Sequence, residues 1–169
     1  SALTTRATHQ IMGNEFSIPE SLFTRIRTEL GIQKSAPVIS RLVRLDQAGG
    51  RTLTLMGVDP FSESVFRPLP DQFVSKDSQE KIRKIFTHGD GVIMSRRLAL
   101  SNGLRPGDEL VLAFGERKKT VTIGALLDSN ATSAVFEGIL LADISLAQEI
   151  LEMGTRITRI DLALESPGE

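Results

Sequence analysis

The stretch that decides the fold is SAPVISRLVRL at residues 35–45, followed by DQAGG at 46–50 and RTLTLMGV at 51–58. Its first segment has a period of two, in which Val38, Leu42 and neighbouring apolar residues are separated by polar ones. Its last segment alternates leucines with threonines, and Ala48-Gly49-Gly50 is typical of a turn between them. The pattern predicts a β-hairpin that ends at Asp59-Pro60, because the residue before proline is sterically restricted.

The chain on either side of this hairpin predicts similar mixed structure. Residues 5–12 favour an extended segment. A helix is expected from Pro19, with an apolar stripe of Leu22, Phe23, Ile26 and Leu30, and Gly31 is expected to end it. Near the C-terminus, residues 138–141 predict a strand, Asp143 is a suitable helix cap, and residues 157–164 alternate as a closing strand.

The middle of the chain favours short strands. A polar helix is predicted over 77–87, a strand over 92–94, and a short helix capped by Ser95. Two further strands, 109–114 and 120–127, are joined by Gly115-Glu116. Before them, the turn from Gly103 to Asp108 resembles a phosphate-binding loop only in its glycines. It lacks the Lys-Ser/Thr pair of a P-loop, so we expect a tight turn stabilised by Asp108.

Together these elements predict an α+β protein. The two ends of the chain, strand-helix-hairpin and strand-helix-strand, would form one split α/β lobe, and the middle would be an inserted small β-rich lobe. The expected boundaries place residues 1–68 and 133–169 in the discontinuous lobe and residues 69–132 in the insert.

Composition excludes several classes of function. Twenty basic residues against twenty-one acidic ones leave no basic excess for nucleic acid. The absence of cysteine excludes disulfides and thiolate chemistry. No apolar run approaches the roughly 20 residues of a membrane-spanning helix, and the start lacks a signal-peptide pattern. A piece of a longer protein cut free of its membrane segments would have the same character.

Few residues suggest chemistry. His9 and His88 are far apart, no nucleophile elbow accompanies them, and their spacing does not suit zinc. Asp59, Asp108, Asp128 and Asp161 are expected at strand ends or turns. We therefore predict no catalytic, cofactor or metal residues in this chain.

Two groups of surface side chains are candidates for contacts. Phe61, Phe66 and Phe73 flank a proline-rich connector, where they would pack a joint between lobes or form an apolar patch for a partner. Arg41, Arg44 and Arg51 on the hairpin are expected on a solvated face.

An ordered series of short motifs resembles a known family. The motifs are Ser35-Ala36-Pro37-Val38, Met56-Gly57-Val58-Asp59, Val92-Ile93-Met94-Ser95, the turn from Gly103 to Asp108, Val121-Thr122-Ile123-Gly124, and the run from Leu146 to Leu162. In this order they are similar to the periplasmic core domain of FtsX-like ABC permeases, the group that includes MacB and the lipoprotein-releasing permeases. The resemblance extends from about Thr5 to about Leu164.

The resemblance implies a periplasmic domain inserted between the first two transmembrane helices of an inner-membrane permease subunit. ATP would be hydrolysed in the cytoplasm by a separate ATPase subunit, so this domain would need no cofactor and would act by movement. A second permease subunit and a periplasmic adaptor or lipoprotein would be its partners. Two alternatives stay open: a free-standing ligand-binding β-barrel module, and a small hydrolase that uses His88 with a nearby acid.

Overall fold

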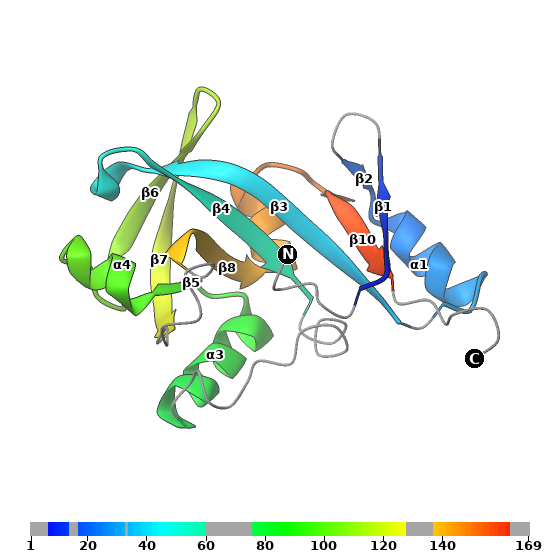
Figure 1. Cartoon of the computed structure of the whole chain (residues 1–169), viewed down its shortest axis with the longest axis horizontal. Coiled ribbons are helices and arrows are strands. Elements are labelled where there is room, and N and C mark those ends of the chain that lie inside the picture. The colour runs from blue at the N-terminus through cyan, green and yellow to red at the C-terminus, as the bar shows by residue number, and fades with distance from the viewer. Residues whose placement is uncertain (1–6, 14–16, 33, 60–75, 128–136, 163–169) are drawn as a thin grey trace.

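In the computed structural model of the chain, the described residues are 7–13, 17–32, 34–59, 76–127 and 137–162 (Figure 1). The helices are α1 (Ser21–Thr28), η2 (Asp46–Ala48, a 3-10 turn), α3 (Lys76–His88), α4 (Arg96–Ser101) and α6 (Ile144–Ile150). The strands are β1 (His9–Met12), β2 (Ile18–Pro19), β3 (Ser35–Leu45), β4 (Arg51–Val58), β5 (Val92–Ser95), β6 (Glu109–Phe114), β7 (Arg117–Leu127), β8 (Ile139–Asp143), β9 (Arg156–Ile157) and β10 (Arg159–Leu162).

Eight of the described strands form one sheet, which closes on itself. The order is β1-β10-β3-β4-β8-β5-β7-β6, and β6 also pairs with β3. The strands from β3 to β6 therefore make a closed six-stranded barrel, while β10 and β1 continue the sheet outside it. Strands β4 and β8 are parallel, as are β5 and β7, and the other neighbours in the sheet run antiparallel.

Strand β3 belongs to both parts of the sheet. Its first residues, Ser35 to Val38, pair with β10, and its last two, Arg44 and Leu45, pair with β6. On its other edge β4 runs beside it from Val38 to Leu45. Figure 1 shows β3 crossing the molecule from the β10 end to the β6–β7 hairpin.

Side chains fill the interior of the barrel. Every strand of the ring contributes at least one residue that is less than 2% exposed to a single apolar cluster. These residues are Leu45, Leu53, Leu55, Leu140, Met94, Ile123, Leu110 and Leu112. Alternation along each strand turns them inward, as the period of two predicts.

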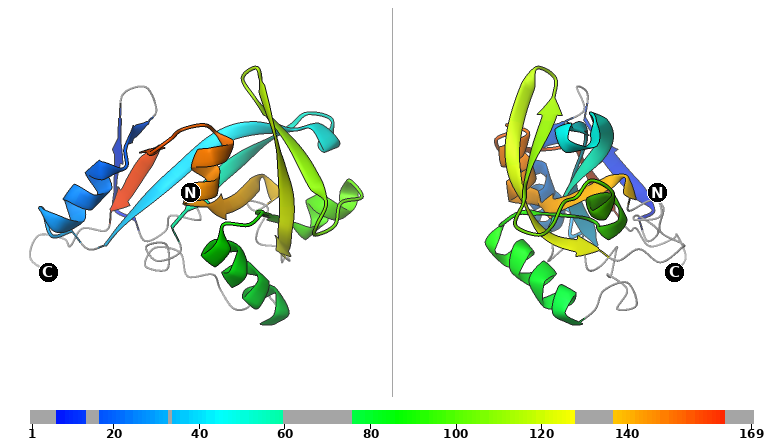
Figure 2. Two further views of the ribbon diagram at one scale, coloured as in Figure 1. Left: turned by 180° about the vertical axis from the view of Figure 1, so that it is seen from behind. Right: turned by 90° about the vertical axis from the view of Figure 1, so that its left-hand side faces the viewer.

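Helix α3 covers the outside of the barrel. Ile82 and Ile85 pack on a second cluster that includes Ile93, Ala125 and Leu141. Strand β7 contributes to both clusters because its pairing with β5 shifts by one residue around Gly124. Such a bulge turns the following side chains to the opposite face. Figure 2 shows α3 projecting from the barrel, away from the β6–β7 hairpin.

Most predicted elements are confirmed, including the hairpin β3–β4 and the Gly115-Glu116 turn between β6 and β7. Ser95 caps α4 by accepting from the Leu98 N–H at 3.2 Å. Asp143 caps α6 by accepting from the Ser145 N–H at 3.0 Å. The predicted mixed α and β class is confirmed, and the sheet dominates it.

Several details of the prediction are wrong. Leu42 is 69% exposed, because Ile39, Val43 and Leu45 are the buried residues on this part of β3. Pro19 pairs with Arg156 in β2–β9, so α1 begins after it. Leu30 is 69% exposed, because α1 ends at Thr28 and the chain leaves through Gly31 at a φ of 67°.

The predicted arrangement of two lobes is not confirmed. Strands β5, β6 and β7, which the sequence places in the insert, lie in one sheet with β3, β4 and β8. The two predicted boundaries, at residues 68/69 and 132/133, lie outside the described residues and stay predictions.

Candidate functional site

A groove with a volume of about 1060 Å³ lies beside α3 in the described part of the surface. Helix α3 forms one wall with Lys81, Lys84 and His88, and α6 contributes Leu146, Glu149 and Ile150. Strand β7 forms the floor from Lys119 to Thr122, together with Gly124. We call this hollow the α3 groove.

Glycine sets the depth of the α3 groove. A Cβ atom on Gly124 would lie 2.6 Å from Ile85 Cδ1 and 3.1 Å from the Asp90 carbonyl oxygen. Gly91, at a φ of 82°, brings the chain from α3 into β5 close to the Thr122 carbonyl. Two glycines therefore let α3 and its following turn lie directly on β7.

The α3 groove has a mixed charge. Lys81, Lys84 and Lys119 are basic, whereas Asp90 and Glu149 are acidic. Lys119 Nζ lies 3.4 Å from Glu152 Oε1, so part of its charge is already compensated. A lining that combines charges of both signs with threonines on the floor and a few apolar side chains on the walls is suited to contact with a polar or amphipathic surface.

His88 is the histidine in the lining of the α3 groove. It is exposed at the end of α3, and its Nδ1 lies 3.0 Å from the carbonyl oxygen of Lys84. In the described part of the chain no hydrogen bond joins His88 to a carboxylate. The acid that the hydrolase alternative needs is therefore not provided by the described contacts.

The remaining histidine and the aspartates have local roles. His9 is exposed on β1, with Nδ1 at 2.8 Å from Thr8 Oγ1. Asp59 follows the end of β4 as predicted. Asp108 stabilises its turn by accepting from the Arg105 N–H at 2.9 Å, which confirms the expectation. Asp128 lies outside the described residues.

Asp161 contradicts its prediction. It lies within β10 rather than at a strand end, it is 0% exposed, and its Oδ1 is 3.0 Å from Arg159 Nε. The burial arises because β10 lies between β1 and β3. Arg159 and Asp161 are two positions apart, so in a strand they lie on the same face and can form an ion pair. This spacing was the signal in the sequence that could have indicated a paired, buried Asp161.

The predicted partner contacts cannot be placed. Phe61, Phe66 and Phe73 lie outside the described residues. In the part of the chain that is described, no group of three or more histidine and carboxylate side chains could hold a metal ion. The filled interior of the barrel does not favour a ligand-binding barrel, which requires an internal pocket.

Comparison with known proteins gives a consistent result. No protein-family model matches the chain. It is 32% identical over 166 residues to an uncharacterized ABC transporter permease protein of Mycobacterium tuberculosis. The alignment covers 97% of this chain and 19% of the relative, so the chain spans about a fifth of that protein's length.

Two solved structures share the fold. The extracellular domain of the noncanonic ABC-type transporter YknZ from Gram-positive bacteria has a TM-score of 0.57 at 11% identity, over 94% of this chain and 84% of that one. The periplasmic region of MacB from Actinobacillus actinomycetemcomitans has a TM-score of 0.54 at 15% identity, over 98% and 78%. None of the helices in the described residues is both long and apolar enough to cross a membrane.

Proposed function

Because the chain is a MacB-like periplasmic-type domain in fold and resembles a permease in sequence, we propose that it is the extracytoplasmic domain of an ABC-transporter permease subunit. One observation carries this proposal. Nearly the whole chain aligns with a permease protein, and two extracytoplasmic regions of transporters have the same fold. The 32% identity to the permease protein is a similarity of sequence, and the two solved structures support the same assignment separately, through the fold.

The proposed action is mechanical. A separate ATPase subunit hydrolyses ATP in the cytoplasm, and the permease transmits the resulting movement to this domain. The domain then acts on a substrate or a partner protein outside the membrane, with a second permease subunit beside it. A domain of this kind needs a rigid body and contact surfaces rather than catalytic residues. The filled barrel and the α3 groove suit that requirement.

The location of the domain can be tested with one introduced cysteine, because these 169 residues have none, and the unsubstituted full-length protein labelled in parallel gives the background. Ser101 is exposed at the end of α4, so Ser101→Cys in the full-length protein offers an accessible thiol. A membrane-impermeant maleimide should label it in intact cells. Labelling that requires disruption of the inner membrane would place the domain in the cytoplasm and contradict the proposal.

A buried position in the same chain is the matched control. Ala142 is 0% exposed in β8, so Ala142→Cys should react only after the protein is denatured. Equal labelling of both variants in intact cells would mean that the domain had unfolded. Protein in which Ala142→Cys stays unreactive before denaturation, while Ser101→Cys is labelled only after the inner membrane is disrupted, overturns the proposal.

A further inference from the structure

Strand β3 has a stretch without a neighbouring strand on one edge. Within the described residues, β10 pairs with this edge as far as Val38, and β6 pairs with it from Arg44. Ser40 is satisfied by a side chain, since its N–H donates to Thr158 Oγ1 at 3.0 Å. The edge between Arg41 and Val43 therefore has no strand partner, although β4 runs along the opposite edge.

The main chain of Leu42 points into this gap. Thr158 N–H donates to the Val38 carbonyl, and Ser40 N–H donates to Thr158 Oγ1, so both Val38 and Ser40 direct main-chain groups toward the β10 edge. In a strand, the main-chain groups of every second residue point to the same edge. Leu42 follows in this series and directs its N–H and C=O to the same side.

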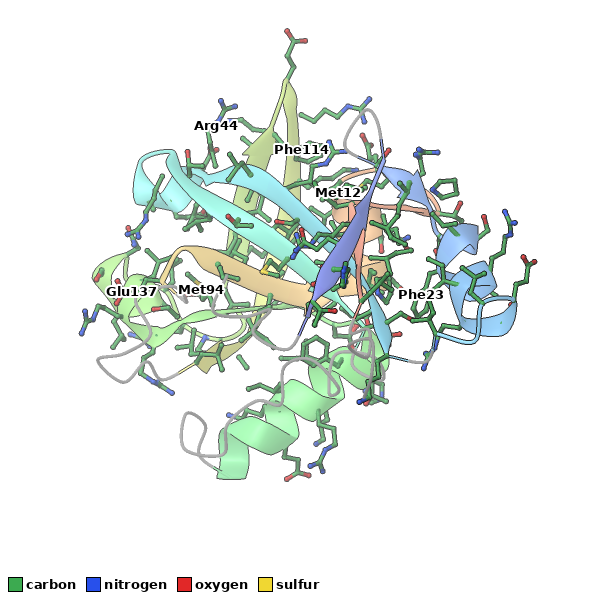
Figure 3. All side chains as sticks on the ribbon, turned by 45° about the vertical axis from the view of Figure 1, so that its right-hand side comes forward. Met12, Phe23, Arg44, Met94, Phe114 and Glu137 are labelled. Atoms are coloured by element: carbon green, nitrogen blue, oxygen red, sulfur yellow. The ribbon has the colours of Figure 1, made fainter. Side chains whose placement is uncertain are left out.

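A small hollow lies at this position. It has a volume of about 530 Å³ and is lined by Arg41, Leu42, Phe114, Gly115, Glu116, Arg117 and Leu151, a set that we call the β3 notch. Leu42 is 69% exposed there, and Leu151 is buried. Figure 3 shows Phe114 and Arg44 at the end of the molecule that carries the β6–β7 hairpin.

The charges around the β3 notch favour an acidic ligand. Arg41 and Arg117 line it, and Arg44 Nη2 donates to the Gly115 carbonyl at 3.3 Å. Glu116 is the acidic residue of the lining. Arg117 also pairs with Glu152, which in turn contacts Lys119. Arginines thus outnumber carboxylates at the notch, and exposed arginines suit carboxylate groups.

We propose that the β3 notch binds a short extended segment of another polypeptide, in which an apolar side chain is flanked by acidic ones. The segment adds as a strand at Leu42, and its main chain bonds the Leu42 N–H and C=O, with which no described strand pairs. Its apolar side chain covers Leu42 and Phe114, and its carboxylates face Arg41 and Arg117. This inference does not rest on the proposed function, because peptide binding and membrane location are measured separately.

The test uses three heptapeptide probes titrated into the ¹⁵N-labelled chain and followed by NMR. The first is Ac-Thr-Val-Asp-Leu-Asp-Val-Thr-NH₂, the second has lysine in place of both aspartates, and the third has N-methylleucine at its centre. The acidic peptide should shift the amide signals of Leu42, Phe114 and Gly115 in a saturable manner. The lysine peptide and the N-methylated peptide should each bind at least about tenfold more weakly. The first loses the charge match with the arginines, and the second loses a main-chain hydrogen-bond donor.

Two exposed leucines provide matched variants. Leu42→Gln should weaken binding of the acidic peptide about tenfold, whereas Leu100→Gln, at a side chain that is 64% exposed on α4, should leave it unchanged. Native dispersion of the amide spectrum verifies that each variant is folded. Arg41→Glu gives a second, independent weakening.

Several results would overturn the inference. They are no shift at millimolar acidic peptide, equal affinity for the lysine peptide, shifts located away from Leu42, or full binding by the N-methylated peptide. Analytical ultracentrifugation tests whether a second copy of the chain occupies the notch. A dimer of the chain that Leu42→Gln abolishes would show that the notch binds a second copy of the chain instead.

Discussion

Thr158 is the residue at which the last two strands separate. It lies between β9 and β10, is 7% exposed, and bonds β3 with both its main chain and its side chain. Its N–H donates to the Val38 carbonyl at 3.0 Å, and its Oγ1 accepts from the Ser40 N–H at the same distance. One side chain thus replaces the carbonyl that a continuous strand would offer.

Replacing Thr158 by valine tests this role. Valine has nearly the same shape but cannot accept a hydrogen bond, so the partly buried Ser40 N–H loses its partner. We expect the free energy of unfolding to fall by about 1–3 kcal/mol. Urea denaturation followed by circular dichroism measures the change. Thr120→Val, at an exposed position on β7, should stay within about 0.5 kcal/mol of the parent.

Equal stability of the Thr158→Val and Thr120→Val variants would show that the Thr158 hydroxyl contributes nothing to the fold. A changed slope in the denaturation curve would instead point to a less compact native state. An unchanged slope with a lower midpoint is the result that the hydrogen bond predicts.

Capping residues were predictable from the sequence, but buried polar residues were not. Ser95, Asp108 and Asp143 each bond an amide within three positions, so local sequence contains all that is needed. Asp161 and Thr158 depend on strands far away in the chain. The alternation in residues 157–164 indicates a strand with one exposed face, whereas β1 and β3 pair with β10 on both edges and bury Asp161.

Helix α6 is held against the sheet at Gly57. A Cβ atom on this glycine would lie 2.5 Å from Ala147 Cβ and 3.2 Å from Ile144 Cα and from Ile39 Cβ. These are main-chain or first side-chain atoms, which cannot rotate away. The small residues Gly57 and Ala147 therefore determine how closely α6 approaches β4.

The contact predicts coupled effects of two substitutions. Gly57→Ala should lower the free energy of unfolding by about 1–3 kcal/mol, because it overpacks a rigid contact. Ala147→Gly should cost about 1 kcal/mol through lost helix propensity. The double variant should be more stable than the sum of the two losses, since the second change makes room for the first. Thermal and urea denaturation of all four proteins give the coupling energy.

Additive losses in that cycle would contradict the close contact. A Gly57→Ala protein as stable as the parent would show that α6 shifts without cost. The stability of Gly57→Ala alone separates these two results, because it falls in the first and is unchanged in the second.

At the level of elements, long periodic segments were predicted and short ones were not. The hairpin β3–β4 has a clear period of two over each strand. Strand β2, Ile18–Pro19, and strand β9, Arg156–Ile157, have two residues each, which is too short for any periodicity. Leu42 was misassigned because β3 changes neighbours along its length, and a sequence pattern gives no sign of that change.

Eight of the ten described strands belong to one sheet, and β2 and β9 pair separately. In the barrel the three strands of the predicted outer lobe, β3-β4-β8, are followed by the three of the predicted insert, β5-β7-β6, and β3 joins the barrel to β10 and β1. The two groups pair only briefly, at Ile93 with Leu141 and at the last two residues of β3 with β6, but side chains from all six strands share one buried apolar cluster. We therefore expect the two predicted lobes to unfold together.

Tryptophan probes can test this cooperativity, because the chain has neither tryptophan nor tyrosine. Phe23→Trp reports on α1, and Phe114→Trp reports on the end of β6, where both phenylalanines are half-buried. In each variant the fluorescence midpoint in urea should equal the midpoint from circular dichroism. Comparison within each variant removes any effect of the substitution itself on stability.

Different midpoints for fluorescence and circular dichroism would show separate unfolding units. That result would support the two lobes that the sequence suggested, in spite of the shared sheet. If the fluorescence midpoint lies at a lower urea concentration than the circular dichroism midpoint in only one variant, the part of the fold that carries that tryptophan unfolds first.

At the level of the molecule, the fold class was predictable and the arrangement was not. The order of helices and strands gave a mixed protein, but nothing in the pattern of residues 109–127 indicates that β6 meets β3 to close a ring. The candidate site could not be predicted from the sequence for the same reason, since it depends on how the elements are arranged. Lys84 and Lys119 are ordinary surface lysines in the sequence, and only the position of α3 brings them to one groove.

The closed ring also determines the order in which the chain can fold. The hairpins β3–β4 and β6–β7 join neighbours and can form early, because short loops are quick to close. The ring itself requires contacts such as Arg44 with Gly115, which are 71 positions apart, and the sheet beyond the ring requires Ser40 with Thr158, which are 118 apart. Distant contacts slow folding, since chain entropy must be lost before they contribute. The barrel therefore closes last, and a nascent chain gains its native sheet only after its C-terminal strands have been synthesised.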